Sequence, residues 1–175
     1  LEHFRPKAII FSGIAGAMNS TLTAGDIVIG KQLAYHDYGR MSATGFEKWS
    51  TQNPYNFNKN PLYFPCDSIL VSIAEQAVNK VHFNPINEHV PKVISGTIIT
   101  GDIFLADRKK NIELRNSFNA DAVEMEGASI AQVCFQQKVP FVIIRSLSDS
   151  ADDSATLDFV KFGKAAAENS AQLVL

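Results

Sequence analysis

The chain is 175 residues long, and 46% of its side chains are hydrophobic, which is enough for one domain with a buried core. Its formal net charge of −2 excludes the strong basic field that attracts nucleic acid or anionic lipid. Its two cysteines lie far apart and predict neither a disulfide framework nor a zinc knuckle. Together with the lack of an apolar run of ~18 residues, this predicts a soluble cytoplasmic protein without a nucleic-acid or membrane partner.

The first part of the chain predicts two strands and a long loop. Residues 7–12, KAIIFS, predict a buried strand that runs into a tight turn at GIAGA. Residues 25–37 predict a second strand that is broken or bulged near Gly30. Residues 38–65 lack a periodic pattern and predict a long loop, although their many aromatic side chains argue against simple disorder.

The rest of the chain alternates helices and strands. Asp67 or Ser68 can cap a helix whose apolar positions continue to Val81. The elements expected after it are a strand at 92–102, a charged helix at 107–118, a strand at 120–124, a helix at 127–137, a buried strand at 140–148 and a terminal helix at 156–175. The inward side chains expected of the terminal helix are Leu157, Val160, Ala167, Ala171 and Val174. The alternation predicts a single α/β domain over residues 1–175, with a central mixed or largely parallel β-sheet flanked by helices.

Four clusters of polar or small residues follow the predicted strands. They are residues 12–18, 100–102, 124–126 and 146–153. Because ligands of α/β sheets gather at the carboxyl ends of the strands, we expect these clusters to converge on one cleft.

The segment SGIAGAM at 12–18 lets the backbone approach a ligand closely, because glycine lacks a Cβ. It has neither the glycine spacing of a dinucleotide fingerprint nor the Lys-Ser/Thr of a P-loop. A plain tight turn is the alternative interpretation.

Two sets of carboxylates stand in apolar surroundings. Asp149 follows a nearly continuous apolar strand, where a carboxyl group can have a raised pKa and act as a general acid; it can also simply cap a turn. Glu124 and Glu126 share one face if the segment is extended, and can then accept hydrogen bonds from a sugar diol. As acids in the first turn of a helix, they would instead interact with its dipole. The four histidines show no metal-ligand spacing, so no metal is expected.

The segments SGIAGA, AGDIVIG, TGDIF, AVEMEGASIAQVC and PFVIIRSLSDSAD occur in the order and at the spacing of a known family. The chain resembles the purine nucleoside phosphorylase/uridine phosphorylase superfamily, and most of all its bacterial 5′-methylthioadenosine/S-adenosylhomocysteine nucleosidase branch. The resemblance covers nearly the whole chain apart from residues 39–65. It implies an α/β domain of the nucleoside phosphorylase type, usually in a homodimer, that cleaves the N-glycosidic bond of an adenine nucleoside without a cofactor.

The resemblance also implies roles for particular residues. Asp149 matches the family's proton donor to purine N7, and Glu126 matches the glutamate that holds the ribose hydroxyls. The remaining matches are Ser148 beside the acid, Met125 under the sugar, Phe104 and Leu105 at the base, Phe159 at the 5′ substituent, Ala15 and Gly16 at the ribose, and Arg145 near the acid. Glu124 is expected to be a supporting acid beside Glu126.

The branch of the superfamily is indicated by one position. Phosphorylases commonly carry an arginine two residues before the first glycine of the SGIAGA segment, where this chain has Phe11. Because phosphate binding needs cationic side chains, water is favoured as the nucleophile. A phosphate-dependent phosphorylase and a non-catalytic nucleoside-binding relative remain the alternatives. Family members also begin with a strand and a glutamate-bearing turn without a counterpart here, so the chain is expected to be N-terminally incomplete.

Overall fold

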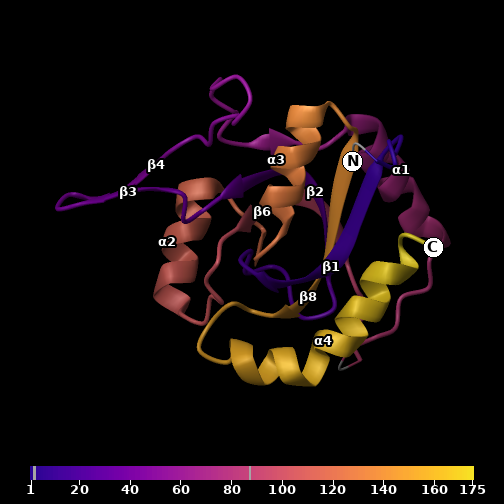
Figure 1. The fold of residues 1–175 in the computed structure, drawn as a ribbon. Helices are drawn as coiled ribbons and strands as arrows, with labels where there is room; N and C mark the ends of the chain where they lie inside the picture. Colours follow the sequence, from indigo (N-terminus) through magenta and orange to yellow (C-terminus); the bar gives the residue numbers. More distant parts are fainter. Residues whose placement is uncertain (2, 87) are drawn as a thin grey trace.

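The computed structural model describes residues 1, 3–86 and 88–175, and these form one α/β domain (Figure 1). The central sheet has six strands in the order β5-β2-β6-β7-β1-β8. In chain order they are β1 (Ile9–Ala17), β2 (Ile27–Tyr35), β5 (Phe64–Pro65), β6 (Val93–Thr100), β7 (Ala122–Glu124) and β8 (Phe141–Asp149). Parallel pairs such as β1–β8 and β2–β6 occur beside the antiparallel pairs β1–β7 and β2–β5. The predicted mixed sheet is confirmed.

The sheet curves until its edge strand β8 also pairs with β2, in antiparallel register from Ile27 opposite Ser146. Strand β2 shifts register between Gly30 and Gln32, which confirms the predicted irregularity near Gly30. The innermost side chains of β2 and β8, such as Ile29 and Ile143, are fully buried. The curvature thus encloses the apolar core between the strands and the helices outside them.

Helices flank this sheet on its outside, as Figure 1 shows. They are α1 (Ser68–Ala77) with the short 3-10 helix η1 (Val78–Lys80), α2 (Arg108–Phe118), α3 (Gly127–Gln137) and α4 (Ala155–Gln172). The Asp67 side chain accepts hydrogen bonds from the amides of Ile69 and Leu70, so the predicted cap of α1 is confirmed. None of the described helices combines the length and the apolar character that crossing a membrane requires.

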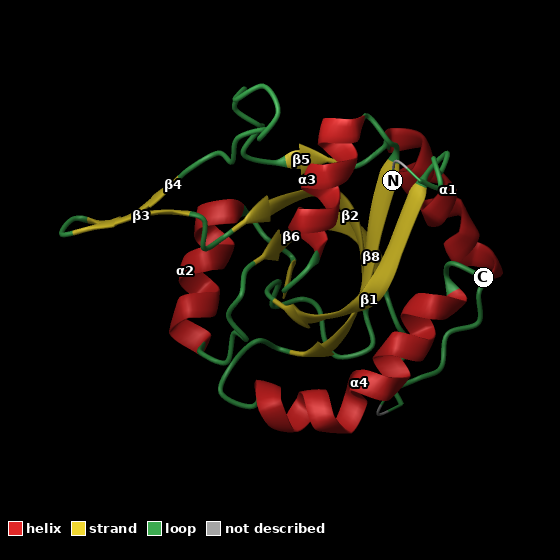
Figure 2. Cartoon of the chain, viewed as in Figure 1, coloured by secondary structure: helices red, strands yellow, loops and turns green. Residues whose placement is uncertain are grey.

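Two expectations for the first half of the chain are wrong. The GIAGA segment is no turn, because β1 continues through it to Ala17 and pairs with β8 along nearly its whole length. Residues 38–65 also contain regular structure, namely the hairpin of β3 (Gly39–Ser42) and β4 (Gly45–Lys48), which projects from the body of the domain (Figure 2). The glycines of β1 serve close packing, as described below.

The prediction of which α4 residues face inward is also wrong. Leu157 and Val160 are 77% and 80% exposed, whereas small residues such as Gly163 and Ala166 are buried. The backbone amide of Gly13 in β1 donates to the Ser170 hydroxyl, which fixes α4 against the sheet. Close approach of a helix to a strand needs small side chains, so the contact face does not follow hydrophobicity.

Candidate active site

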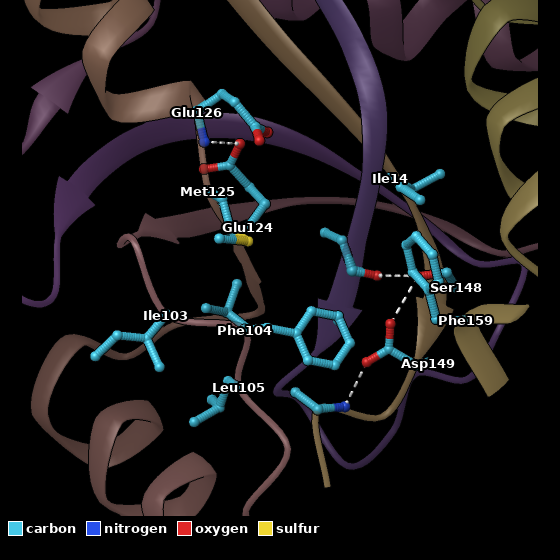
Figure 3. A pocket seen from close by; sticks show the side chains of 14 residues that line it. Ile14, Ile103, Phe104, Leu105, Glu124, Met125, Glu126, Ser148, Asp149 and Phe159 are labelled. Atoms are coloured by element: carbon cyan, nitrogen blue, oxygen red, sulfur yellow. Dashed lines mark hydrogen bonds between the residues drawn. The ribbon is translucent and has the colours of Figure 1, made fainter. Parts of the chain in front are cut away.

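A cavity of about 390 Å³ lies where β1, β7 and β8 end (Figure 3). Its lining residues are Ile14, Ala15, Gly16, Ile103, Phe104, Leu105, Val123, Glu124, Met125, Glu126, Ser148, Asp149, Ala151 and Phe159. Three of the four polar clusters expected to converge therefore do so. The fourth, residues 100–102, supplies no lining side chain, but its Thr100 is hydrogen bonded to Glu124.

Every site residue proposed from the resemblance lines this cavity except Arg145. The lining residues that the sequence did not single out are Ile14, Ile103, Val123 and Ala151. Each of these four residues lies within two positions of a proposed site residue in the sequence. Their position beside the motifs is therefore the signal that could have identified them. Apolar residues of this kind have no chemistry of their own that a sequence can reveal.

Asp149 forms one end of the cavity, at the last residue of β8. It is 4% exposed, and this burial raises the pKa of its carboxyl group above the ordinary value. The Ser148 hydroxyl donates to Oδ2 at 2.7 Å and the Ala151 amide to Oδ1 at 2.8 Å, and both bonds act in the opposite direction on that pKa. The sequence-based expectation of a raised pKa is confirmed in direction, and the carboxyl group also caps a turn.

An irregularity in β8 places two neighbouring side chains on the cavity. Ala15 of β1 pairs with Leu147, but the next residue, Gly16, pairs with Asp149. Ser148 is thus an extra residue in β8, which makes a β-bulge. In a regular strand Ser148 and Asp149 would point to opposite faces, whereas here both line the cavity.

The glycines of β1 make room for the polar side chains of β8. A Cβ on Gly16 would lie 2.8 Å from Oδ1 of Asp149, and a Cβ on Gly13 would lie 2.1 Å from Nη1 of Arg145. Real Cβ atoms do not approach so closely, so any larger residue would displace these groups. These glycines, which were expected to form a turn, instead leave space for the carboxyl group of Asp149 and the guanidinium group of Arg145.

The Glu124–Glu126 segment forms the other end of the cavity. Strand β7 ends at Glu124 and α3 begins at Gly127, with Glu126 as the N-cap residue. The expectation that both glutamates share one face of a strand is therefore wrong, and so is the alternative of two acids in the first turn of a helix, because Glu124 ends the strand and Glu126 precedes the first turn of α3. The Glu124 side chain is 2% exposed, whereas that of Glu126 is 63% exposed.

Arg145 lies against Glu124 and does not line the cavity. Its Nη2 is 2.6 Å from Oε2 of Glu124 and 3.8 Å from Oε2 of Glu126. Its guanidinium group also stacks on the ring of Phe11, 4.3 Å from the ring centroid. Burial between these partners makes Arg145 part of the wall behind the glutamates.

Apolar side chains form the remaining walls. The rings of Phe104 and Phe159 meet edge to face, with centroids 5.9 Å apart and an interplanar angle of 87°. Figure 3 shows Phe104 between the glutamates and Asp149, with Phe159 above Asp149. Such walls suit a planar aromatic ligand with few polar groups.

Neither cysteine nor histidine chemistry is indicated at this site. Both cysteines, Cys66 and Cys134, are free and buried, and neither lines the cavity. The residues that the structure describes contain no group of three or more His, Cys, Asp or Glu side chains that could hold a metal ion.

Comparison with known proteins gives the same picture over the whole chain. The phosphorylase superfamily model matches residues 1–175. A curated 5′-methylthioadenosine/S-adenosylhomocysteine nucleosidase from Psychromonas ingrahamii is 42% identical over 99% of this chain and 70% of its own length. The chain thus spans about 70% of the length of such relatives.

Solved structures show the same likeness. The nucleosidase of the same name from Neisseria meningitidis, in complex with methylthio-immucillin-A, has a TM-score of 0.81 and 38% identity, covering 99% of this chain and 69% of that one. Futalosine hydrolase from Helicobacter pylori has a TM-score of 0.78 and 31% identity, covering 98% of this chain and 67% of that one. With this fold, these motifs and these relatives, the chain belongs to the phosphorylase superfamily, in the family of the 5′-methylthioadenosine/S-adenosylhomocysteine nucleosidases.

Proposed function

We propose that the protein hydrolyses the N-glycosidic bond of adenine nucleosides, releasing adenine and a ribose derivative. One observation carries the proposal: a buried carboxyl group with a raised pKa, Asp149, and an accessible carboxylate, Glu126, line one cavity of about 390 Å³. Glycoside cleavage needs both, an acid for the leaving group and an acceptor for the sugar hydroxyls. Relatives about 40% identical are named as nucleosidases of this kind.

Asp149 is the proton donor in this proposal. Its raised pKa keeps the acid form available, and that proton passes to N7 of the purine as the bond between C1′ and N9 breaks. The bonding electron pair leaves with the purine, which departs as neutral adenine. Phe104 stacks on the base, while Leu105 lies at its edge.

Glu126 acts on the sugar. As the glycosidic bond breaks, positive charge develops on the ribose, and hydrogen bonds from its hydroxyls to a carboxylate strengthen. Met125 packs under the ribose, and Ala15 and Gly16 line the side from which the nucleophile arrives. A water molecule adds its oxygen to C1′, and the proton that it loses balances the one that Asp149 donates.

Water is favoured over phosphate because none of the described residues that line the cavity has a cationic side chain. Arg145, the arginine nearest the glutamates, pairs with Glu124 and stacks on Phe11. Phosphate binding would need a guanidinium group free to make bidentate hydrogen bonds. In the sequence, Phe11 stands at the position where phosphorylases commonly carry an arginine, which also supports this choice.

The 5′ substituent is proposed to be a thioether, as in 5′-methylthioadenosine or S-adenosylhomocysteine. Phe159, whose ring meets that of Phe104, gives this part of the cavity an apolar wall. Futalosine is the second candidate, since a hydrolase of that substrate is 31% identical.

A cytoplasmic homodimer is the proposed working form. Two free cysteines suit a reducing compartment. The large side chains exposed between residues 38 and 57 suit burial against a second copy; they are Tyr38, Met41, Phe46, Trp49, Tyr55 and Phe57. Analytical ultracentrifugation checks the dimer, which a monomeric mass would contradict.

The function is tested by measuring release of the free purine base, adenine or hypoxanthine, when the complete gene product acts on a set of nucleosides. The substrates are 5′-methylthioadenosine, S-adenosylhomocysteine, adenosine, inosine and futalosine, each with and without phosphate. We expect the thioethers to be turned over fastest and to yield a free sugar whether or not phosphate is present. Phosphate-dependent formation of a sugar 1-phosphate would indicate a phosphorylase, and tight binding without turnover would indicate a non-catalytic relative.

A further inference from the structure

We propose that Thr100 is a positioning residue for Glu126 and acts through Glu124, an inference that rests on the proposed role of Glu126 in sugar binding. Thr100 ends β6, is 2% exposed and does not line the cavity. Nothing in its position brings it into contact with a substrate. Its hydrogen bonds, however, connect Glu124 to the start of α3.

The first amides of α3 are capped by residues outside the helix. Oε2 of Glu124 accepts hydrogen bonds from the amides of Glu126, at 3.2 Å, and Gly127, at 2.7 Å. The Thr100 hydroxyl accepts from the amide of Ala128 at 2.8 Å. These three amides would otherwise be unsatisfied, as the first amides of every helix are without a cap.

This arrangement explains why the Glu126 carboxylate is available to a ligand. Glu126 is the N-cap residue, at a position where Ser, Thr, Asp and Asn side chains normally turn back to the amides of the first turn. Here that side chain makes no capping hydrogen bond and is 63% exposed. Because Glu124 and Thr100 satisfy the amides, Glu126 keeps its carboxylate for the cavity.

Thr100 also fixes the orientation of Glu124. Its hydroxyl has one hydrogen, and since its oxygen accepts from Ala128, the hydrogen is directed to Oε1 of Glu124. The other oxygen of Glu124, Oε2, receives Arg145 and the two amides. Without the hydroxyl, the carboxylate of Glu124 can rotate and the Ala128 amide loses its hydrogen-bond acceptor. The carboxylate of Glu126 can then turn back to accept a hydrogen bond from that amide, which takes it away from the cavity.

The test compares two substrates in three variants of the complete gene product. The substrates are 5′-methylthioadenosine and its 3′-deoxy analogue, and the quantity is the ratio of their kcat/KM values, which measures recognition of the 3′-hydroxyl. Thr100→Val removes the hydroxyl at nearly constant volume, and Thr100→Ser restores it. Thr97→Val is the matched control, since Thr97 lies in the same strand, and its hydroxyl accepts instead from Nε2 of Gln32.

We expect the ratio to fall about tenfold in Thr100→Val, the size of one lost hydrogen bond to a charged group. Thr100→Ser and Thr97→Val are expected to keep the ratio of the unsubstituted protein, even where Thr97→Val lowers its melting temperature. A purely structural role of Thr100 would lower both kcat/KM values equally. If Thr100→Val does not fold, Thr100→Ala carries the same expectation.

The two proposals fail differently. In the first case, the unsubstituted protein discriminates between the two substrates and Thr100→Val has the same ratio of kcat/KM values. The proposed role of Thr100 is then wrong, and that of Glu126 stands. If the unsubstituted protein does not discriminate between them, sugar recognition by Glu126 is wrong and the role of Thr100 falls with it.

Discussion

The two ends of the cavity carry the same functional group in opposite environments. At the β8 end, the Asp149 carboxyl group is buried and its pKa is raised. At the α3 end, the Glu126 carboxylate is open to solvent, with Arg145 3.8 Å away. The buried environment favours the protonated form of Asp149, as a proton donor requires, whereas the exposed carboxylate of Glu126 is accessible as a hydrogen-bond acceptor. The difference shows that surroundings, more than residue type, assign the two roles.

The largest expected effect comes from removing the proton at the buried end. Asp149→Asn keeps the shape of the side chain but supplies no acidic proton, so kcat for adenine release should fall at least about a hundredfold. The control is Asp153→Asn, the same change at an exposed position. Activity close to that of the unsubstituted protein, in a folded Asp149→Asn variant, would show that the acid lies elsewhere.

At the open end, a smaller loss is expected. Glu126→Gln keeps one acceptor oxygen but loses the charge, so kcat/KM should fall about tenfold to a hundredfold. Glu113→Gln on α2 is the matched control, because Glu113 is an exposed partner of Lys110. A fall equal to that of Asp149→Asn would contradict the division of roles between the two ends.

The packing behind the open end can be tested through stability. Gly13→Ala would push against Arg145, so the free energy of unfolding should fall by about 1–3 kcal/mol. Gly163→Ala in α4 places its Cβ 3.7 Å from Ile14, an ordinary contact, and should not destabilise the protein. Chemical denaturation of both variants measures the difference, and equal stabilities would mean that Arg145 can move aside freely.

The smallest effect concerns the pH profile. Activity needs protonated Asp149, so kcat/KM should decrease as the pH rises through its raised pKa. The hydrogen bond from Ser148 lowers that pKa, so Ser148→Ala should move the decrease to higher pH. Ser146→Ala is the control, because the hydroxyl of Ser146 donates to the Gly25 carbonyl instead. A shift to lower pH would contradict the assignment of the acid to Asp149.

The contribution of Asp149 to the free energy of unfolding should also decrease as the pH rises. Burial raises the folded-state pKa of Asp149 above the ordinary value of an aspartate, so the stabilising contribution of this group is complete at acid pH and is lost as the pH rises through the raised pKa. Asp149→Asn should remove this part of the pH dependence, which unfolding curves at several pH values would measure.

Local signals predicted most of the fold. The α3 helix has the predicted bounds, Gly127–Gln137, and Asp67 caps α1 as expected, since caps and apolar periodicity are encoded by neighbouring residues. The face of α4 and the path of β1 through its glycines were not predictable in the same way. Both depend on close contact between α4 and β1 or between β1 and β8, and such long-range contacts leave no local pattern.

The site was predictable to a similar extent. Motif resemblance indicated the residues of the cavity, but the distinct positions of Glu124 and Glu126 depend on where β7 stops and α3 begins. The contribution of Thr100 was hidden because its partners lie 24 and 28 residues further along the chain. Sequence patterns identified the carboxylates, and only the structure separates the accessible one from the buried one.

The extra residue in β8 makes the chemistry sensitive to strand length. Ser148 and Asp149 face the cavity together only because the pairing with β1 skips one position. Deleting one residue here would restore regular alternation and turn either the acid or its hydroxyl neighbour away from the substrate, while the sheet itself could still form. A homologue with a shortened strand would therefore be expected to keep the fold but to lose either the acid from the cavity or the hydrogen bond that lowers the pKa of the acid.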